Sequence, residues 1–332
     1  MRIDYTQQGI YLPDIDLWLD PRGDRCAQAW ISHGHGDHAY GRHSTIIGTP
    51  LTLEFYRMRW PEEQDQPQIL RPLEFGESLD AGEARLTCYP AGHILGAAQL
   101  LIEFRGERVL YTGDIKLQEP LCGQATQPVV CDRLIIESTF GLPIYRFLSR
   151  EEARDRILYF ARESFEEGSV PVFLGYPLGR GQEIANVLCE AGIPTAIHGA
   201  IARYLPVYEE AGFGFPGALP YDNRAIPGRA LLVPPEFRRQ IEASSKKYRI
   251  AYVSGWAALD NARARSGAEE LIAYSDHAGF EELLELVRRS GARQVDVIHG
   301  YTVPFARILR LQGIDANAPE PATARASAGD VE

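Results

Sequence analysis

The segment His33-Gly34-His35-Gly36-Asp37-His38 follows the mostly apolar run Ala27-Gln28-Ala29-Trp30-Ile31-Ser32. Such a run predicts a strand, and a strand that ends at an imidazole before a glycine turn places that imidazole at one edge of a sheet. His33 and His35 then point the same way, while Asp37 and His38 lie beyond a second glycine and can turn toward another point. The segment therefore offers enough nitrogen and oxygen ligands to hold two metal ions from one loop.

Four further motifs lie at the ends of apolar runs in the same way. They contain His93 (residues 91–96), Asp114 (110–114), His277 (275–278) and His299 (297–300). Together with the first segment they include six of the eight histidines of the chain. A lone histidine is usually an ordinary core or surface residue, but five motifs of this kind favour a metal site.

We predict two neighbouring metal sites from these motifs. His93 completes the site of His33 and His35, His299 completes the site of Asp37 and His38, and Asp114 bridges the two. The predicted ligands are His33, His35, Asp37, His38, His93, Asp114 and His299. Nitrogen and oxygen ligands without cysteine fit Zn²⁺ or Mn²⁺. Two such ions about 3.5–4 Å apart share a hydroxide that serves as the nucleophile of a hydrolysis.

Three residues outside this ligand set have predicted roles beside it. Asp20 follows an apolar strand and is expected to orient a ligand imidazole or to hold the 33–38 loop; a simple turn before Pro21 is the alternative. Glu137 is expected to orient and polarise His277, which then donates a proton to the leaving oxygen or holds the scissile phosphate. A salt bridge at the sheet edge is the alternative for Glu137. With Asp37, whose removal is expected to abolish turnover, His277 and Glu137 are the predicted catalytic residues.

Five residues are candidates for contacts with substrate phosphates, and for each an ordinary structural role is the alternative. They are Lys116, Ser138, Thr139, Arg180 and Ser275. Arg180 belongs to the glycine-rich turn Gly179-Arg180-Gly181-Gln182-Glu183, whose backbone N–H groups open a helix. His43 and His198 are expected to be structural.

The composition predicts a globular protein. Hydrophobic residues make up 45% and charged residues 24% of the 332 residues. No apolar run reaches the roughly 18–20 residues that a membrane helix needs, and the N-terminal residues lack the apolar region of a signal peptide. The five scattered cysteines are expected to be reduced and mostly buried, which suits a cytoplasmic protein without a membrane partner.

The net charge of −11 would repel a nucleic acid, but its distribution is uneven. Nine basic residues and three acidic residues lie between Arg224 and Arg265. This local excess can attract phosphates whatever the global sign. A solvated face of no special function is the alternative.

The pattern of predicted secondary-structure elements changes at Leu142-Pro143. Before it, short strands alternate with turns. After it, a capping pattern at Ser149 opens a helix that ends at Gly168, and strands then alternate with helices, one of which is predicted over Ile201–Ala211. After Ser266-Gly267 the first pattern returns, with a strand at 271–274, a helix from Phe280 and a buried strand that ends at His299. We therefore predict one domain of residues 1–141 and 272–315, an inserted α/β module of residues 142–271 with a small parallel sheet, and a disordered tail of residues 316–332.

These motifs resemble those of the metallo-β-lactamase fold, in the branch of nucleases that carry a β-CASP cap. The resemblance covers about residues 1–315 and includes Tyr176-Pro177-Leu178-Gly179-Arg180-Gly181-Gln182-Glu183, which is similar to the GRxQE signature of the cap. It implies an α/β fold in which an αββα sandwich is interrupted by a smaller α/β cap. It also implies a metal-dependent phosphodiesterase with the ligands given above.

Within that branch the chain is similar to the bacterial ligase-associated DNA exonucleases, and also to mRNA 3′-end-processing-factor-like proteins. The short cap, residues 131–145 and Ser254-Gly255-Trp256 carry this resemblance. It implies a DNA exonuclease in repair, working alongside an ATP-dependent DNA ligase and a helicase. His299 favours an RNA substrate instead, because a histidine at this place accompanies RNA substrates in RNase J and in the cleavage-and-polyadenylation endonucleases. An exo- or endoribonuclease in RNA processing is therefore the alternative.

Two remoter interpretations belong to other classes. A small-molecule hydrolase of the same fold would share the metal motifs but would not need the inserted module or the Glu137–His277 pair. A scaffold subunit would have lost ligands, whereas all seven predicted positions are filled here.

Overall fold

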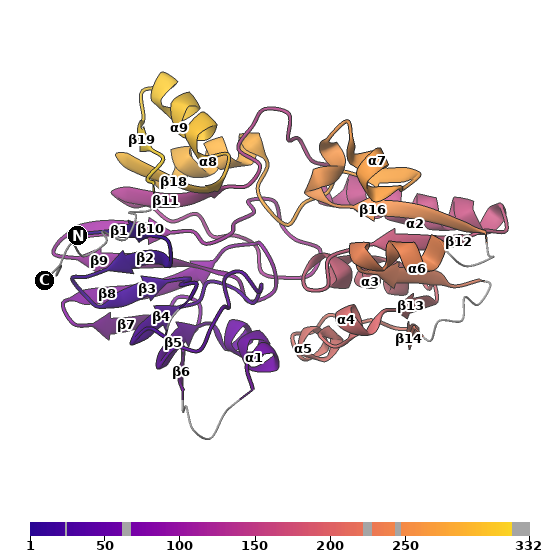
Figure 1. Cartoon of the computed structure of the whole chain (residues 1–332), viewed down its shortest axis with the longest axis horizontal. Helices are drawn as coiled ribbons and strands as arrows, with labels where there is room; N and C mark the ends of the chain where they lie inside the picture. The colour runs from indigo at the N-terminus through magenta and orange to yellow at the C-terminus, as the bar shows by residue number, and fades with distance from the viewer. Residues whose placement is uncertain (24, 62–67, 222–227, 243–246, 321–332) are drawn as a thin grey trace, which may run out of the picture.

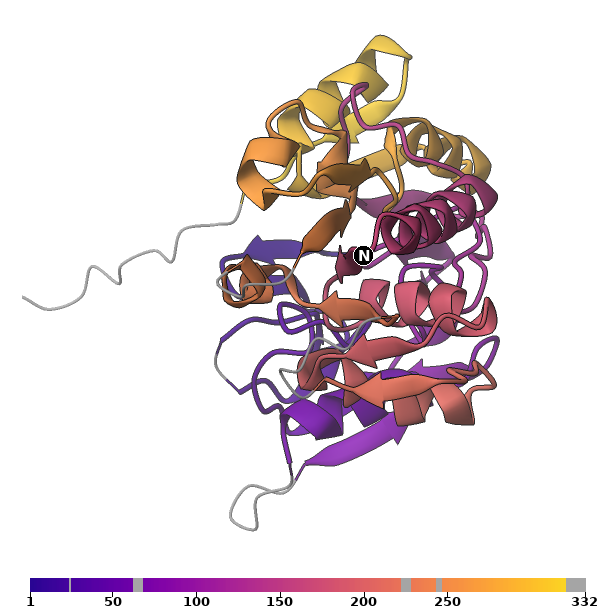
Figure 2. The same ribbon diagram turned by 90° about the vertical axis from the view of Figure 1, so that its right-hand side faces the viewer.

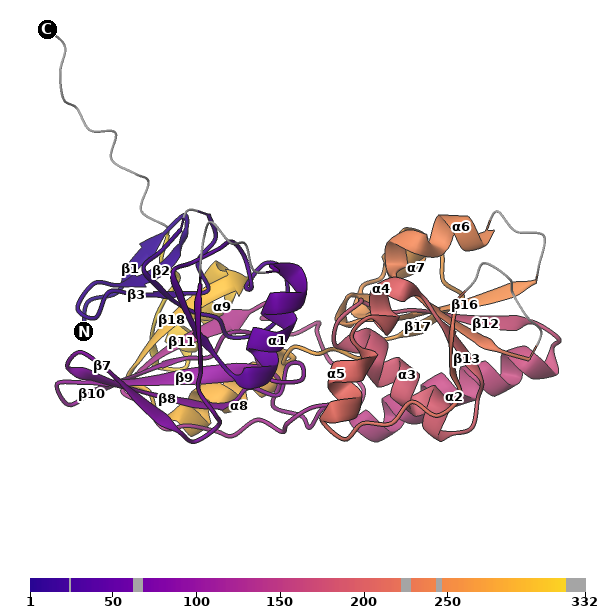
Figure 3. The same ribbon diagram turned by 90° about the horizontal axis from the view of Figure 1, so that it is seen from below.

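A computed structural model of the chain describes residues 1–23, 25–61, 68–221, 228–242 and 247–320. Figures 1 and 3 show two lobes side by side. The first and last parts of the chain form one lobe, and the middle part forms the other. The first lobe contains two sheets and the second lobe one. These elements confirm the predicted mixed α/β class.

The two sheets of the first lobe pack face to face. One has the order β1 (Asp4–Thr6), β2 (Gly9–Leu12), β3 (Leu17–Leu19), β4 (Gln28–Trp30), β5 (Thr45–Gly48) and β6 (Ile69–Pro72). The other has the order β19 (Asp315–Asn317), β18 (Gln294–Gly300), β11 (Arg133–Ser138), β10 (Glu107–Tyr111), β9 (Ala98–Phe104), β8 (Ala84–Pro90) and β7 (Ser78–Ala81). Leu17 and Trp30 of the first sheet share one buried core with Leu100 and Val109 of the second.

Helices cover the outer faces of this pair of sheets. Helix α1 (Pro50–Arg59) packs Leu53 against Ile46 of the first sheet. Helices α8 (Phe280–Ser290) and α9 (Thr302–Leu311) bury Leu283 and Phe305 in the same core as Val295 of the second sheet. The layers of the lobe are therefore helix, sheet, sheet and helix.

The sheet of the second lobe is parallel throughout its described strands, as predicted. Its order is β14 (Ala218–Pro220), β13 (Thr195–Ile197), β15 (Ala230–Val233), β12 (Val170–Leu174), β16 (Tyr248–Val253) and β17 (Glu270–Ile272). Figures 2 and 3 show α2 (Arg150–Glu166) and α3 (Arg180–Glu190) on one face, and α6 (Arg238–Glu242) and α7 (Ala262–Ser266) on the other. Val172 and Phe173 enter different cores on these two faces, which is why the strands are apolar without alternation.

Helix α2 begins with the predicted capping box. The Ser149 Oγ accepts a hydrogen bond from the Glu152 N–H at 3.1 Å, and the Glu152 carboxylate accepts one from the Ser149 N–H at 2.8 Å. Two N–H groups that would lack partners at the helix start are thereby satisfied. Gly168, with φ of +67°, follows the end of the helix.

The structure differs from the sequence expectations in three places. Strand β17 pairs with β16 in the second lobe, so Ile272 belongs to that lobe and the module extends beyond residue 271. The helix expected over residues 201–211 is divided into α4 (Gly199–Ala202) and α5 (Leu205–Glu210), and Pro206 in the first turn of α5 cannot donate the hydrogen bond that would continue α4. Residues 316 and 317 are not a disordered tail, since Ala316 is buried in β19; residues 321–332 lie outside the described residues.

Strand direction explains how the first lobe collects polar side chains at one edge. Strands β3 and β4 run parallel, as do β10, β11 and β18. The carboxyl ends of parallel strands meet at the same edge of a sheet, and Asp20, the 33–38 segment, Asp114 and His299 lie at those ends. His93 follows β8, and His277 follows β17 of the second lobe. Within the described residues no helix combines the length and the apolar composition that crossing a membrane requires.

Candidate metal centre

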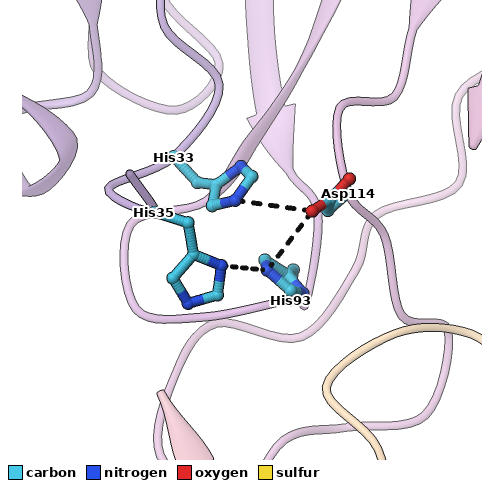
Figure 4. Close-up of side chains that lie close together, drawn as sticks. All are labelled: His33, His35, His93 and Asp114. Atoms are coloured by element: carbon cyan, nitrogen blue, oxygen red, sulfur yellow. Dashed lines mark hydrogen bonds and ion pairs between the residues drawn. The ribbon is translucent and has the colours of Figure 1, made fainter. Parts of the chain in front are cut away.

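Four of the predicted ligands form one compact cluster (Figure 4). One ligand atom from each of His33, His35, His93 and Asp114 lies within 4.8 Å of the others. The Asp114 Oδ2 lies 3.5 Å from the His33 Nε2 and 3.8 Å from the His93 Nε2. The His93 Nε2 lies 3.0 Å from the His35 Nδ1. Residues from three separate loops thus converge on one point.

The outer nitrogens of these imidazoles are held by acceptors, so their inner nitrogens carry lone pairs. The His35 Nε2 donates to the Leu178 carbonyl at 3.0 Å, and the His93 Nδ1 donates to the Asp276 carbonyl at 2.9 Å. The facing His35 Nδ1 and His93 Nε2 are then both acceptors. Two lone pairs 3.0 Å apart repel each other unless a cation lies between them.

The protonation state of the cluster agrees with this geometry. Burial, followed by the neighbouring imidazoles, holds the pKa values of His33 and His93 well below their usual range. Among the described residues the buried His33 Nε2 has no hydrogen-bond partner. Neutral imidazoles with a free nitrogen are the form that binds a divalent ion, so the donor set fits Zn²⁺ or Mn²⁺.

A second group adjoins the same oxygen of Asp114. The His38 Nε2 is 3.4 Å from the Asp114 Oδ2 and 3.8 Å from the Asp37 Oδ2. Asp114 therefore lies close to both His33 and His38, the position expected of a bridging carboxylate. The ring centroid of His299 is 5.7 Å from that of His38, so His299 stands farther out than the other predicted ligands. Arg22 donates to the Asp37 carbonyl at 2.7 Å.

His299 has a strained backbone at the end of β18. Its φ is +53°, and the next residue, Gly300, has a φ of +68°. A Cβ at Gly300 would lie 2.4 Å from the Ser138 carbonyl oxygen of the neighbouring strand. Only glycine fits there, and the turn directs the His299 ring toward His38.

Asp20 lies next to His38, one of the predicted ligands. Its Oδ2 accepts hydrogen bonds from the His38 Nδ1 at 2.6 Å, the Ser32 Oγ at 2.5 Å and the Tyr111 hydroxyl at 2.8 Å. Its Oδ1 accepts the Ser32 N–H at 2.7 Å. The carboxylate thus holds the proton of His38 on Nδ1 and leaves Nε2 to face Asp114.

Glu137 and His277 form the expected pair. The His277 Nδ1 donates to the Glu137 Oε1 at 2.8 Å, and Glu137 also accepts the N–H groups of Ile115 and Thr139. Burial opposes the charged form of His277, but the Glu137 carboxylate outweighs it and raises the pKa of His277 above its usual range. The ring centroid of His277 lies 4.5 Å from that of His93. An imidazole whose charged form is favoured by Glu137 therefore stands directly beside the cluster.

The second lobe takes part in this site. Leu178, whose carbonyl accepts from His35, lies in the Tyr176–Glu183 motif of that lobe. Arg180 forms an ion pair with Glu183 and lies 3.5 Å from the Asp276 carboxylate. Asp276 in turn accepts from His93 through its backbone. The motif therefore fixes two imidazoles of the cluster from outside.

The five residues predicted to contact substrate phosphates have different surroundings. Lys116 and Arg180 are buried, and the two cations lie 4.0 Å and 4.3 Å from the centroid of the Tyr274 ring. The Ser138 Oγ donates to the His299 carbonyl at 2.5 Å, and the Ser275 Oγ accepts the His277 N–H at 2.9 Å. These contacts hold parts of the site together, and Arg180 also lines the hollow next to His35 and His277. Thr139 is half-buried beside Glu137.

The two remaining histidines form hydrogen bonds to the backbone. The buried His43 donates from Nε2 to the Tyr40 carbonyl and accepts the Cys26 N–H. His198 precedes α4, and its Nδ1 accepts the Ala200 N–H at 3.2 Å. Neither belongs to a group of metal-ligating side chains in the described part of the chain.

Sequence reasoning missed several residues that hold the site. Asp276 lies within the 275–278 motif but has no predicted role of its own, and neither have Tyr111 and Ser32, the partners of Asp20. Tyr111 ends a strand shortly before Asp114, which was a usable signal. The roles of Leu178 and Asp276 depend on backbone carbonyls, and no residue type signals those. In the basic stretch, Arg224 and Lys246 lie outside the described residues.

Comparison with known proteins gives several relatives. The chain is 32% identical to a probable DNA ligase of Opitutus terrae over 93% of its own length and 30% of that protein. It is 37% identical to cleavage and polyadenylation specificity factor subunit 3 of Dictyostelium discoideum over 59% of its length and 27% of that protein. It is 28% identical to an RNase J-like protein of Methanocaldococcus jannaschii, over 62% of this chain and 53% of that one. The chain thus spans less than a third of the first two relatives.

The chain was also compared with solved structures and with protein-family models. A crystal structure of a protein of unknown function from Enterococcus faecalis V583 has a TM-score of 0.59 at 16% identity, covering 89% of this chain and 80% of that one. At this identity the likeness concerns the fold alone. No protein-family model matches the chain. By these relatives and by the motifs that converge here, the chain is similar to the metallo-β-lactamase-fold proteins of the β-CASP branch.

Proposed function

We propose that the protein is a metal-dependent phosphodiesterase that acts on nucleic acid, most specifically a DNA exonuclease in repair. The observation that carries the proposal is the group of imidazoles around Asp114, with the Glu137–His277 pair beside it. A centre for two divalent ions and a proton donor are the parts that phosphodiester hydrolysis needs.

In this proposal seven residues hold two divalent ions, Zn²⁺ or Mn²⁺. They are His33, His35, Asp37, His38, His93, Asp114 and His299. When bound, the ions supply Lewis-acid activation of a phosphodiester and of the attacking water. Asp20 orients His38, while Leu178 and Asp276 orient His35 and His93.

His277 acts on the leaving group in this mechanism. Glu137 holds the His277 Nδ1, so the Nε2 of the charged ring is directed away from Glu137 and is free to donate a proton to the leaving oxygen. Glu137 accepts two backbone N–H groups besides His277, which fixes its carboxylate in position. The pair therefore supplies an oriented proton donor beside the cluster.

We further assign the layered first lobe to the αββα sandwich of the family and the second lobe to the β-CASP cap. The helix–sheet–sheet–helix order supports the first assignment, and the inserted parallel sheet supports the second. The cap then begins near residue 142 and extends through Ile272, and a cytoplasmic location accords with the five buried free cysteines.

DNA is the first choice of substrate because the relative matched over 93% of this chain is named a probable DNA ligase. The same relative supports a partnership with an ATP-dependent DNA ligase, and by family resemblance with a helicase. RNA processing is the second candidate. His299 and the names of the cleavage and polyadenylation and RNase J-like relatives favour it.

The test uses sequence-matched single-stranded DNA and RNA, labelled at each end in turn. Protein loaded with Mn²⁺ or Zn²⁺ is compared with the Asp37→Asn variant, which is expected to fold but not to turn over. Stepwise shortening of DNA supports the repair exonuclease and gives its polarity. Preferential cutting of RNA favours the second candidate, and cutting of neither substrate contradicts the proposal.

A further inference from the structure

Two hollows of the structure share a wall. The metal-side hollow has a volume of about 520 Å³ and is lined by His35, Asp37 and His277 among others. The arginine hollow has a volume of about 680 Å³ and is lined by Tyr252, Arg238, Arg239 and Arg265 among others. Tyr176 and Trp256 line both. A ligand that leaves the metal-side hollow past these two rings enters the arginine hollow directly.

The shared wall is built as a firm aromatic surface. The ring centroid of Trp256 lies 4.8 Å from that of Phe140, which lies 5.8 Å from that of His277. A Cβ at Gly255 would lie 2.4 Å from Phe140, so the backbone next to Trp256 packs directly against that ring. The Tyr176 side of the wall is open, since 47% of that residue is exposed. Exposed aromatic faces beside a reaction centre are suited to stacking unpaired bases.

The arginine hollow is positively charged. Three arginines and one acidic residue, Glu236, line it. Arg239 and Arg265 are exposed and form no ion pair with an acidic side chain in the described part of the chain. Arg238 lies across Gly267 and reaches the Arg265 carbonyl at 3.5 Å. These three belong to the basic stretch of the sequence, which therefore faces a groove that continues to the metal centre.

We propose that the arginine hollow is a second nucleic-acid subsite, which binds the phosphates of a single strand whose scissile phosphate lies at the metal centre. In it Arg238, Arg239 and Arg265 pair with successive phosphates, and Tyr176 and Trp256 stack the bases between the two hollows. A single strand is favoured over a duplex because the wall offers ring faces and the bases of a duplex are already stacked. The inference rests on the proposed nuclease function and names how its substrate is held.

The test measures binding apart from cleavage. A fluorescent 15-nucleotide single strand, as DNA and as RNA, and the DNA duplex of the same sequence are titrated in chelator with the full chain, and anisotropy is read over a range of salt. The variant is Arg238→Ala/Arg239→Ala/Arg265→Ala. The matched control is Arg154→Ala/Arg162→Ala/Arg307→Ala, which removes three exposed arginines that line neither hollow.

The wild type and the control are expected to bind both single strands more tightly than the duplex. Loss of three phosphate contacts is expected to reduce the slope of log K against log salt by about 2, at about 0.7 per phosphate. Tyr176→Ala is expected to weaken binding by about 5- to 150-fold with little change in that slope, since it removes stacking and no charge.

Two results would overturn the inference. One is a salt slope for the arginine variant equal to that of the control. The other is a duplex that binds more tightly than the single strands and depends on the same arginines. Failure of the proposed function is distinguishable, because it would abolish cleavage while arginine-dependent binding in chelator persisted.

Discussion

Replacing Asp20 with asparagine tests whether the buried carboxylate sets the proton position of His38. The Asp20 Oδ1 must accept the Ser32 N–H, a backbone donor that cannot reverse. The amide oxygen of Asp20→Asn is therefore held at that place, and its NH₂ group takes the place of Oδ2. There it meets the Ser32 and Tyr111 hydroxyls, which can rotate, and the His38 Nδ1, which must give up its hydrogen.

The consequence falls on the metal centre. If Nδ1 of His38 becomes an acceptor, the proton moves to Nε2, the nitrogen that faces Asp114 at 3.4 Å. That nitrogen can no longer bind an ion. Loss of such an orienting partner typically lowers metal affinity or activity about 10- to 100-fold, and we expect a loss of that size confined to one of the two ions.

The assay is a competitive titration of metal-free protein with Zn²⁺ against a chromogenic chelator, together with urea unfolding. Tyr111→Phe is the matched control, because it removes a donor to the same oxygen but keeps the carboxylate and the His38 proton. It is expected to retain both affinities while losing about 1.5–3 kcal/mol of stability, the usual value of a hydrogen bond to a charged group. Two ions bound by Asp20→Asn with wild-type affinity would refute the reasoning.

Three other perturbations have defined outcomes. His277→Ala should slow cleavage by about 10²–10⁴-fold, the usual size of a general-acid contribution, with an unchanged metal content; a parallel loss of metal would make His277 a ligand instead. Gly300→Ala should lower the free energy of unfolding by more than the roughly 1–2 kcal/mol of a left-handed alanine, because its Cβ would collide with Ser138. Gly313→Ala, at φ of +84° with open space around it, is the control, and equal losses in thermal unfolding would contradict the clash. All five cysteines are buried, and burial raises the pKa of Cys88 to about 12. A thiol reagent should therefore label none of them in the native protein and all five in denaturant, and rapid labelling of the native chain would contradict this packing.

The first lobe was the more predictable part of the fold. Its site motifs follow strand ends, and parallel strand ends meet at one edge, so the convergence of His33, Asp114 and His299 follows from local sequence and elementary sheet geometry. The pairing of Asp20 with His38 and of Glu137 with His277 is also signalled by residue type, since a carboxylate near a ligand imidazole has few other uses.

The contribution of the second lobe was harder to predict for a physical reason. Leu178 and Asp276 hold two imidazoles through backbone carbonyls, and every residue type carries that group. The sequence pattern ends the inserted module at residue 271, within a strand that precedes a site motif, yet all of β17 pairs with β16 of the second lobe. Arg180 looked like a phosphate contact in a glycine-rich turn, but its ion pair with Glu183 is visible only once the helix is formed.

The most direct test of the account counts metal ions. Metal-free protein is titrated with Mn²⁺ or Zn²⁺ while bound metal per chain and cleavage of single-stranded nucleic acid are followed together, with Asp114→Ala beside the wild type. We expect two ions per chain and cleavage that rises as they bind. Asp114→Ala should lose both high-affinity sites, because the Asp114 carboxylate lies close to both His33 and His38. Full cleavage in chelator, or a wild-type chain that binds no divalent ion, would contradict it.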